Sequence, residues 1–211
     1  MGVTLFIVRH GNTFETGEPP RRIGSRTDLP LVQSGRLQAT ELGRWFDAKG
    51  IRFDGVLTSP LSRTRETAAL ILAQQARAPE MVSCDWLAEI DHGPDENQSE
   101  ATVVGRIGAD ALSAWETEGI PPQGWSVDTE ARRAAWQRLF DEQSGGPERT
   151  LLLVTSNGAA RFALLAAPAL REQAKALTSL KLRTGAYGQI RVTADGPRLA
   201  AWDRRPEAGA A

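Results

Sequence analysis

An arginine and a histidine directly follow an apolar, strand-like run near the start of the chain. The run covers residues 5–8, and Arg9, His10 and Gly11 come after it. An arginine fork suits phosphate or carboxylate oxygens, and a glycine permits a tight turn and a close backbone approach to a ligand. These residues predict an anion site at a strand end. The simpler alternative is a polar strand end in which Arg9 pairs with a surface acid.

A second arginine occupies a similar place in "TSPLSRTRETA", residues 58–68. Ser59 is a plausible N-cap and Pro60 a natural first helical residue, which places Arg63 in the first turn of a helix. The amide groups of a helix start attract anions. We therefore expect Arg63 and Arg9 to converge on one anion, and we expect Arg65 to be an exposed helix charge.

Two further stretches supply polar groups beside apolar runs. "LLLVTSNGAAR", residues 151–161, ends a strand with Asn157 and Gly158, whose amide groups could face the same crevice. "LAEIDHGPDE", residues 87–96, carries several carboxylates. In that stretch, Asp95 and Glu96 are expected to belong to a solvated acidic loop.

The elements that must position these residues alternate between strands and helices. Continuously apolar segments of strand length predict strands covered on both faces, and amphipathic patterns predict helices from near Ser34 and after Pro60. We therefore predict an α/β fold: a three-layer α/β/α sandwich with a largely parallel central sheet, whose ligands bind at the carboxyl ends of the strands. The predicted strands are 3–8, 55–58, 150–155, 187–193 and 198–202.

A polar segment at about 79–146 interrupts this rhythm. It contains predicted helices near 99–117 and 128–143, and we interpret it as a helical insertion, or cap, over the active-site edge of the sheet. We expect a single domain at 1–205 and a disordered tail at 206–211.

The composition excludes several classes of protein. The chain has 211 residues, of which 41% are hydrophobic, and a net charge of −1 from 25 basic and 26 acidic residues. This balance does not favour nucleic acid or an anionic membrane as a partner. Cys84 is the only cysteine, and no secretory signal or membrane span is visible. We expect a cytoplasmic protein whose partners are a small phosphorylated substrate and a second copy of the chain in a homodimer.

The motifs and their order along the chain resemble those of the histidine phosphatase superfamily, in its phosphoglycerate-mutase-like branch. "VRHGNT" is similar to the family signature, "RIGSRTDLPLVQSGRLQA" to the run that follows it, "SPLSRTRETA" to the second arginine motif and "LAEIDHG" to the acid segment. The resemblance implies that His10 is the nucleophile that becomes phosphorylated. It implies Arg9 and Arg63 as a phosphate clamp and Glu89 as the proton donor, with no cofactor.

The chain departs from the family pattern at two positions. The family usually has a second histidine in the final motif, where this chain has Asn157 beside Gly158. Thr16 stands where many members carry an asparagine that touches phosphate. The resemblance therefore implies Asn157, Gly158 and Thr16 as phosphate-binding residues. The other histidine, His92, matches no catalytic position of the family, and we interpret it as an incidental loop residue.

Three functions remain open from the sequence. The leading one is a metal-independent phosphatase that hydrolyses a phosphomonoester through a phosphohistidine. A phosphomutase is second, and a weakly active or non-catalytic phosphate-binding protein is third because of Asn157. Two histidines and one cysteine without close ligand spacing make a poor transition-metal site, so no metal ligands are predicted.

Overall fold

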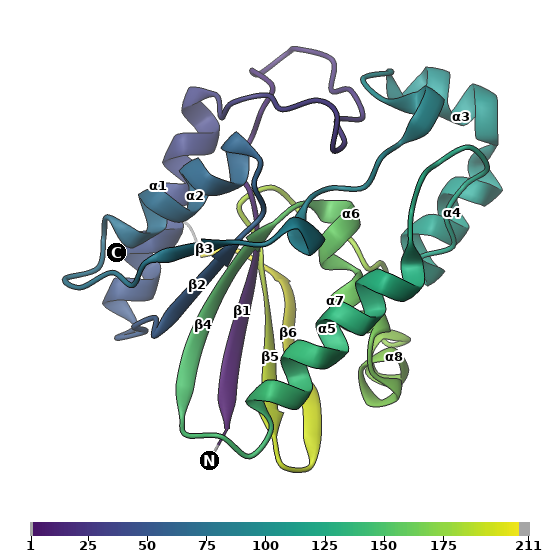
Figure 1. Ribbon diagram of the computed structural model, residues 1–211. Coiled ribbons are helices and arrows are strands. Elements are labelled where there is room, and N and C mark those ends of the chain that lie inside the picture. The colour runs from purple at the N-terminus through teal and green to yellow at the C-terminus, as the bar shows by residue number, and fades with distance from the viewer. Residues whose placement is uncertain (1, 207–211) are drawn as a thin grey trace.

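The computed structural model describes residues 2–206, which form a sheet of six strands (Figure 1). The strands lie in the order β3-β2-β4-β1-β5-β6. Neighbours among the first four are parallel, whereas β5 is antiparallel to β1 and forms an antiparallel hairpin with β6. The strands are β1 (Val3–Arg9), β2 (Gly55–Thr58), β3 (Met81–Ser83), β4 (Arg149–Thr155), β5 (Tyr187–Thr193) and β6 (Gly196–Arg204). The predicted largely parallel sheet is confirmed.

Helices cover both faces of this sheet, as Figure 1 shows. On one face lie α1 (Gln33–Ala48) and α2 (Ser62–Leu72), and on the other α5 (Thr129–Gln143), α6 (Asn157–Ala160), α7 (Phe162–Leu165) and α8 (Pro168–Ala174). Each face has its own apolar core, in which Phe46 of α1 and Trp136 of α5 are fully buried. The predicted three-layer α/β/α arrangement is therefore confirmed.

Strand β1 is apolar at successive positions because it contributes to both cores. Ile7 packs in the core beneath α5, whereas Phe6 and Val8 pack in the core beneath α1 and α2. The Phe6 ring meets the Phe46 ring edge to face, with their centroids 5.0 Å apart. Burying a side chain of this size stabilises a fold by roughly 1.5–3 kcal/mol. The strand that carries Arg9 is thus anchored on both sides.

Only part of the segment predicted as an insertion leaves the layers of the fold. Strand β3 and helix α5 lie within 79–146 but belong to the layers, so only the chain between them leaves the sheet. The part that leaves the sheet holds two 3₁₀ turns, η1 (Asp85–Leu87) and η2 (Gly93–Asp95), and two helices, α3 (Glu100–Ile107) and α4 (Ala109–Glu118). Helices α3 and α4 lie at the upper right of Figure 1. The predicted helix 99–117 is two helices because Gly108, at φ 81°, breaks it.

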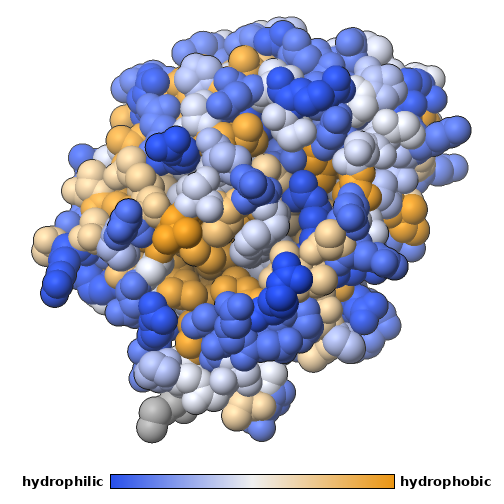
Figure 2. All heavy atoms as spheres, in the orientation of Figure 1, coloured by the Kyte–Doolittle hydropathy of each residue, from blue (hydrophilic) through white to orange (hydrophobic). Residues whose placement is uncertain are grey.

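Two regions were not predicted from the sequence. Helices α6 and α7 follow β4 in a stretch that is almost wholly buried, so it shows no amphipathic period, whereas α8 buries Leu170 and Ala174 and exposes most of its other side chains. Strand β3 forms the exposed edge of the sheet and carries the exposed side chains of Met81 and Val82. Figure 2 shows apolar residues gathered at the left centre of this view, where β3 lies in Figure 1.

Of the tail predicted to be disordered, 207–211 lies outside the described residues. Within 2–206, no helix combines the length and apolar character needed to span a membrane.

Candidate functional site

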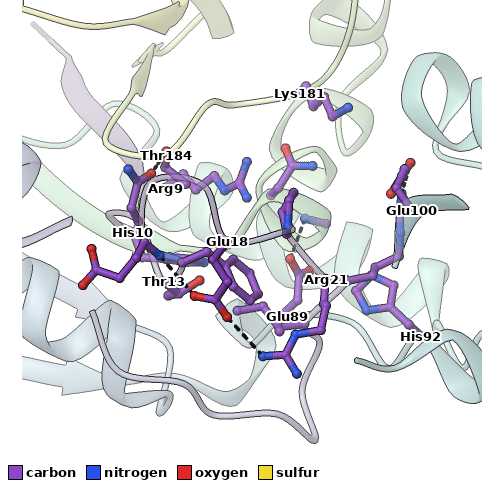
Figure 3. Close-up of a pocket in the computed structure, with 18 of the residues that line it drawn as sticks. Arg9, His10, Thr13, Glu18, Arg21, Glu89, His92, Glu100, Lys181 and Thr184 are labelled. Atoms are coloured by element: carbon purple, nitrogen blue, oxygen red, sulfur yellow. Dashed lines mark hydrogen bonds and ion pairs between the residues drawn. The ribbon is translucent and has the colours of Figure 1, made fainter. Parts of the chain in front are cut away.

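A cavity of about 570 Å³ lies at the carboxyl ends of β1 and β4 (Figure 3). Its wall includes residues of the loop after β1, the acid segment after β3 and the start of α6. Most of the predicted site residues line it, namely Arg9, His10, Thr16, Glu89, Asn157 and Gly158. Arg63 does not line it. The cavity therefore lies where a parallel sheet is expected to bind a ligand.

His10 is held at the end of β1 in a defined orientation. Its backbone N–H donates to the Thr155 carbonyl of β4 at 3.1 Å, and its Nδ1 lies 2.8 Å from the Gly11 carbonyl oxygen. A carbonyl only accepts, so Nδ1 carries the proton and Nε2 keeps its lone pair. Burial, Arg63 and Arg9 hold the pKa of His10 well below its ordinary value. His10 is therefore a neutral imidazole at physiological pH.

Gly11 makes its close approach to helix α1 and not to the cavity. A Cβ at Gly11 would lie 2.3 Å from the Gly35 carbonyl oxygen, and one at Gly35 would lie 2.2 Å from the Asn12 carbonyl oxygen. Gly11 is also not among the cavity-lining residues. The expectation that this glycine lets the backbone approach a ligand is therefore wrong. The two glycines let the loop after β1 pack on the first turn of α1.

Arg9 directs its guanidinium along the cavity wall. One terminal nitrogen, Nη1, donates to the Leu182 carbonyl at 2.8 Å, while the buried Nε has no hydrogen-bond partner among the described residues. Burial lowers the pKa of Arg9 to about 10, and the nearby Glu89 opposes this shift. Arg9 remains charged at neutral pH, and it still has N–H groups that could donate hydrogen bonds to an anion.

Arg63 lies behind the cavity wall and is fully buried. It donates from Nη1 to the Thr27 carbonyl at 2.8 Å and from Nη2 to the Gly24 carbonyl at 3.1 Å. It also lies 3.6 Å from Asp28. Its charge still reaches the site, because Arg63 is the larger of the two arginine effects that lower the pKa of His10.

The position of Arg63 in the first turn of α2 is confirmed, but the predicted helix start is wrong. The helix begins at Ser62, and neither Ser59 nor Pro60 belongs to it. The Asp28 carboxylate caps this helix from a distant loop by accepting the Ser62 N–H at 2.9 and 3.0 Å. The Ser59 hydroxyl instead accepts the Leu61 N–H at 3.2 Å.

Glu89 is a buried carboxylate held by two backbone groups. Its Oε2 accepts the Gly158 N–H at 3.0 Å and its Oε1 accepts the Ile90 N–H at 2.9 Å. Burial alone would raise the pKa of Glu89. The electrostatic effects of His92 and Arg63 and the two N–H groups outweigh that effect and hold the pKa of Glu89 below its ordinary value. Glu89 is therefore ionised at neutral pH.

Asn157 and Gly158 begin helix α6 beside this carboxylate. The N–H of Gly158, predicted to face phosphate, donates to Glu89 in the structure. A Cβ at Gly158 would lie 2.2 Å from Oε1 of Glu89, so only glycine fits there. The Oδ1 of Asn157 accepts the Leu182 N–H at 2.9 Å, while the residue also lines the cavity. Its amide NH₂ group remains as the donor for a ligand.

His92 is the site residue that sequence reasoning missed. It lines the cavity with only 4% of its surface exposed, and its ring meets the Trp125 ring edge to face at 4.6 Å. Its Nδ1 lies 3.5 Å from Glu96 Oε2. Its effect on Glu89 makes it part of the electrostatics of the site. The interpretation of His92 as an incidental loop residue is wrong; its place three residues after Glu89 was the available signal.

The acidic loop after His92 is also not solvated as expected. Asp95 is 1% exposed and accepts from Arg106 Nε at 2.6 Å and from Trp125 Nε1 at 2.7 Å. Burial would raise the pKa of Glu96, but hydrogen bonds from His92, Thr27 and the Gly24 backbone lower it to about 2. The carbonyl oxygen of the same Gly24 accepts a hydrogen bond from Arg63. Asp95 and Glu96 therefore help to hold the residues that form the wall of the site.

No cluster of three or more histidine, cysteine or acidic side chains within residues 2–206 is arranged to hold a metal ion. The arrangement at the cavity instead combines a neutral imidazole, arginine charge and a buried carboxylate. Such a set can carry nucleophilic attack on an anionic centre with proton transfer.

The chain is similar in sequence to a phosphatase and to phosphoglycerate mutases. The chain is 39% identical to a broad-specificity phosphatase of Saccharomyces cerevisiae over 70 residues, which are 33% of this chain and 30% of that protein. It is 36% identical to a 2,3-bisphosphoglycerate-dependent phosphoglycerate mutase of a Methylobacterium species over 61% of this chain and 62% of that protein. The chain thus spans less than two thirds of either relative. With the corresponding mutase of Methylorubrum populi it shares 29% identity over 90% of both chains.

Solved structures share the fold at lower identity. The alpha-ribazole phosphatase of Shigella flexneri matches with a TM-score of 0.71 and 23% identity over 96% of both chains. A phosphoserine phosphatase of Entamoeba histolytica in complex with 3-phosphoglyceric acid matches with a TM-score of 0.74 and 21% identity, over 97% of this chain and 98% of that one. The sequence profile of the histidine phosphatase superfamily (branch 1) matches residues 5–205. The chain therefore belongs to the histidine phosphatase superfamily.

Proposed function

We propose that the protein is a metal-independent phosphatase that hydrolyses a small phosphomonoester through a phosphohistidine on His10. One observation carries the proposal: the bond from Nδ1 to the Gly11 carbonyl leaves the Nε2 lone pair of a neutral imidazole in a cavity shared with Arg9 and Glu89. A nucleophile needs that lone pair, and an adjacent carboxylate can move the proton that the reaction requires.

In the first step, Nε2 of His10 attacks the phosphorus and the bond to the ester oxygen breaks. Arg9 donates to the phosphoryl oxygens, and the charge of Arg63 behind the wall offsets the charge that develops on them. The amide of Asn157 and the hydroxyl of Thr16 supply further donors from the cavity wall. The products of this step are phosphohistidine and the leaving alkoxide, which takes a proton from Glu89.

Glu89 must acquire that proton before it can donate it. Its pKa is below the ordinary value while it faces the surrounding positive charge. A phosphate ester brings two negative charges to the same wall, and a like charge favours the neutral form of a carboxyl group. Substrate binding therefore raises the pKa of Glu89 and prepares it as a general acid.

In the second step, the ionised Glu89 takes a proton from a water molecule as that water attacks the phosphohistidine. The P–N bond breaks, His10 recovers its lone pair and phosphate leaves. Glu89 thus serves first as an acid and then as a base.

A phosphomutase is the second candidate, favoured by the match to phosphoglycerate mutases over 90% of the chain. A mutase would return the phosphoryl group from His10 to an organic hydroxyl instead of to water. The third candidate, a non-catalytic phosphate-binding protein, rests on Asn157. The buried Glu89, held in the cavity wall with His10, favours catalysis.

The experiment that tests the proposal compares the two histidines of the chain. We expect His10→Ala to abolish phosphate release and the acid-labile phosphoenzyme formed from a labelled ester, because it removes the nucleophile. His92→Ala serves as the matched control and should still form the phosphoenzyme. An acid-labile phosphoenzyme in His10→Ala would contradict the assignment. Transfer of the label to 3-phosphoglycerate in preference to water would favour the mutase.

A further inference from the structure

Besides Arg9, the cavity wall carries three further cationic side chains. Arg21 and Arg22 come from the loop after β1, and Lys181 comes from the segment before β5. In a site that binds phosphate esters, such cations could recognise a second anionic group on the substrate. Their contacts decide whether they are available for that purpose.

Arg22 is the most firmly engaged of the three. Its Nη2 donates to both oxygens of Glu100, at 2.8 and 2.7 Å, and its guanidinium lies 5.2 Å from the centre of the Trp125 ring. Backbone bonds fix it further, because Arg22 donates its N–H to the Gln98 carbonyl at 2.8 Å and accepts the Asn97 N–H at 2.8 Å. Glu100 itself lines the cavity. The positive charge of Arg22 is therefore matched within the wall.

The other two cations also have carboxylate partners. Arg21 lies 3.6 Å from Glu18, another lining residue, and Figure 3 shows this pair. Lys181 lies 2.6 Å from Glu116. Glu15 adds one more carboxylate to the wall. Apart from Arg9 and Glu89, the lining thus holds three cations and three carboxylates, and Lys181 pairs with Glu116, which lies outside the lining.

The same wall also offers apolar surface to the carbon skeleton of a substrate. Phe14, Pro20, Ile23 and Trp115 line the cavity among the charged pairs. This surface can cover an organic leaving group. Because the cations beside it are paired with carboxylates, they leave no excess positive charge to attract a second anion.

We infer that the substrate is a monophosphate ester whose leaving group is a neutral or amine-bearing alcohol, and that a second carboxylate or phosphate on the leaving group is disfavoured. The inference rests on the proposed phosphatase function and adds the substrate class. A second anion would have to displace Glu100 or Glu18 from its arginine or lie beside these carboxylates. Like charges placed together exclude the wrong partner.

Two matched pairs of esters test this inference with the native protein. Glycerol 3-phosphate and 3-phosphoglycerate differ by a hydroxymethyl group in place of a carboxylate, and phosphoethanolamine differs from O-phosphoserine by the absence of a carboxylate. We expect kcat/KM to be at least about tenfold higher for the carboxylate-free member of each pair. A ratio near one, or a reversed ratio, would overturn the inference.

The parallel use of p-nitrophenyl phosphate separates this inference from the proposed function. Its hydrolysis with a phosphoenzyme on His10, together with a preference for the carboxylate-bearing esters or rejection of all four, would overturn the substrate class alone. If no ester including p-nitrophenyl phosphate were hydrolysed, the proposed function would be contradicted and the inference would fail with it.

Two variants test the cause of the preference. Glu100→Gln removes the partner of Arg22, so we expect the relative kcat/KM for 3-phosphoglycerate to rise about tenfold. Should that variant not fold, Glu18→Gln removes the partner of Arg21, and the Glu18 side chain is 42% exposed. The matched control is Glu172→Gln on α8. It removes the carboxylate of a surface ion pair with Lys175 and should leave the ratio unchanged. An unchanged ratio in the folded cavity variants would overturn the explanation.

Discussion

Glu89 carries the proton transfers of the proposed reaction, so its replacement should depend on the leaving group. Glu89→Gln keeps the size of the side chain but cannot donate a proton as the acid does. We expect kcat to fall much more for an alkyl phosphate than for an aryl phosphate, whose leaving oxygen needs little protonation. Steady-state kinetics on both esters would measure this. Equal losses on both would favour a structural role for Glu89.

Asn157 supplies an amide to the cavity and tests how the final motif contacts phosphate. If its NH₂ group donates to the phosphoryl oxygens, Asn157→Ala should cost about 1.5–3 kcal/mol, or roughly ten- to hundredfold in turnover. Phosphate affinity and kcat would be measured together with the melting temperature, because the variant also loses the bond to the Leu182 N–H. Unchanged affinity and turnover would show that Asn157 does not contact the phosphate.

The start of helix α6 places a backbone N–H against the carboxylate of the acid segment, and this junction requires glycine. Gly158→Ala would put a Cβ 2.2 Å from Glu89 Oε1, so the carboxylate must move. We expect a loss of turnover of at least about tenfold, since small displacements of catalytic groups are costly. Kinetic measurements would be compared with Gly105→Ala in helix α3, where a new Cβ meets nothing within 4 Å.

The Gly105→Ala control should retain full activity, and its helix should gain about 0.5–1 kcal/mol of stability from the better helix former. If Gly158→Ala had the same kinetics as this control, the position of Glu89 would not depend on the contact with α6.

The molecule as a whole brings no metal-binding cluster to the cavity among its described residues, and its proposed chemistry uses arginine charge instead. We therefore expect phosphatase activity to survive EDTA. Orthovanadate should inhibit the protein, because it mimics a pentacoordinate transition state that the site is expected to stabilise. Activity that is lost in EDTA and restored by magnesium would contradict the proposed mechanism.

The amino-acid sequence by itself determined the layers and the strand ends that carry the site. The apolar run that became β5 has the predicted bounds, and the strand ending at Arg9 is apolar on both faces because both are buried. Signals of this kind depend on neighbouring residues, so a linear pattern contains them. The order of the motifs was sufficient to assign the family that residues 5–205 match.

The tertiary structure decided which groups meet in the cavity and which stand behind it. Asp28 caps a helix that begins 34 residues later, and Gly158 holds a carboxylate 69 residues before it. Arg63 is fully buried behind the wall, while His92 faces the cavity with Glu89. These contacts join segments that are distant along the chain, and the hydrogen-bonding needs of buried charges select among them. No local pattern of residues encodes such a choice.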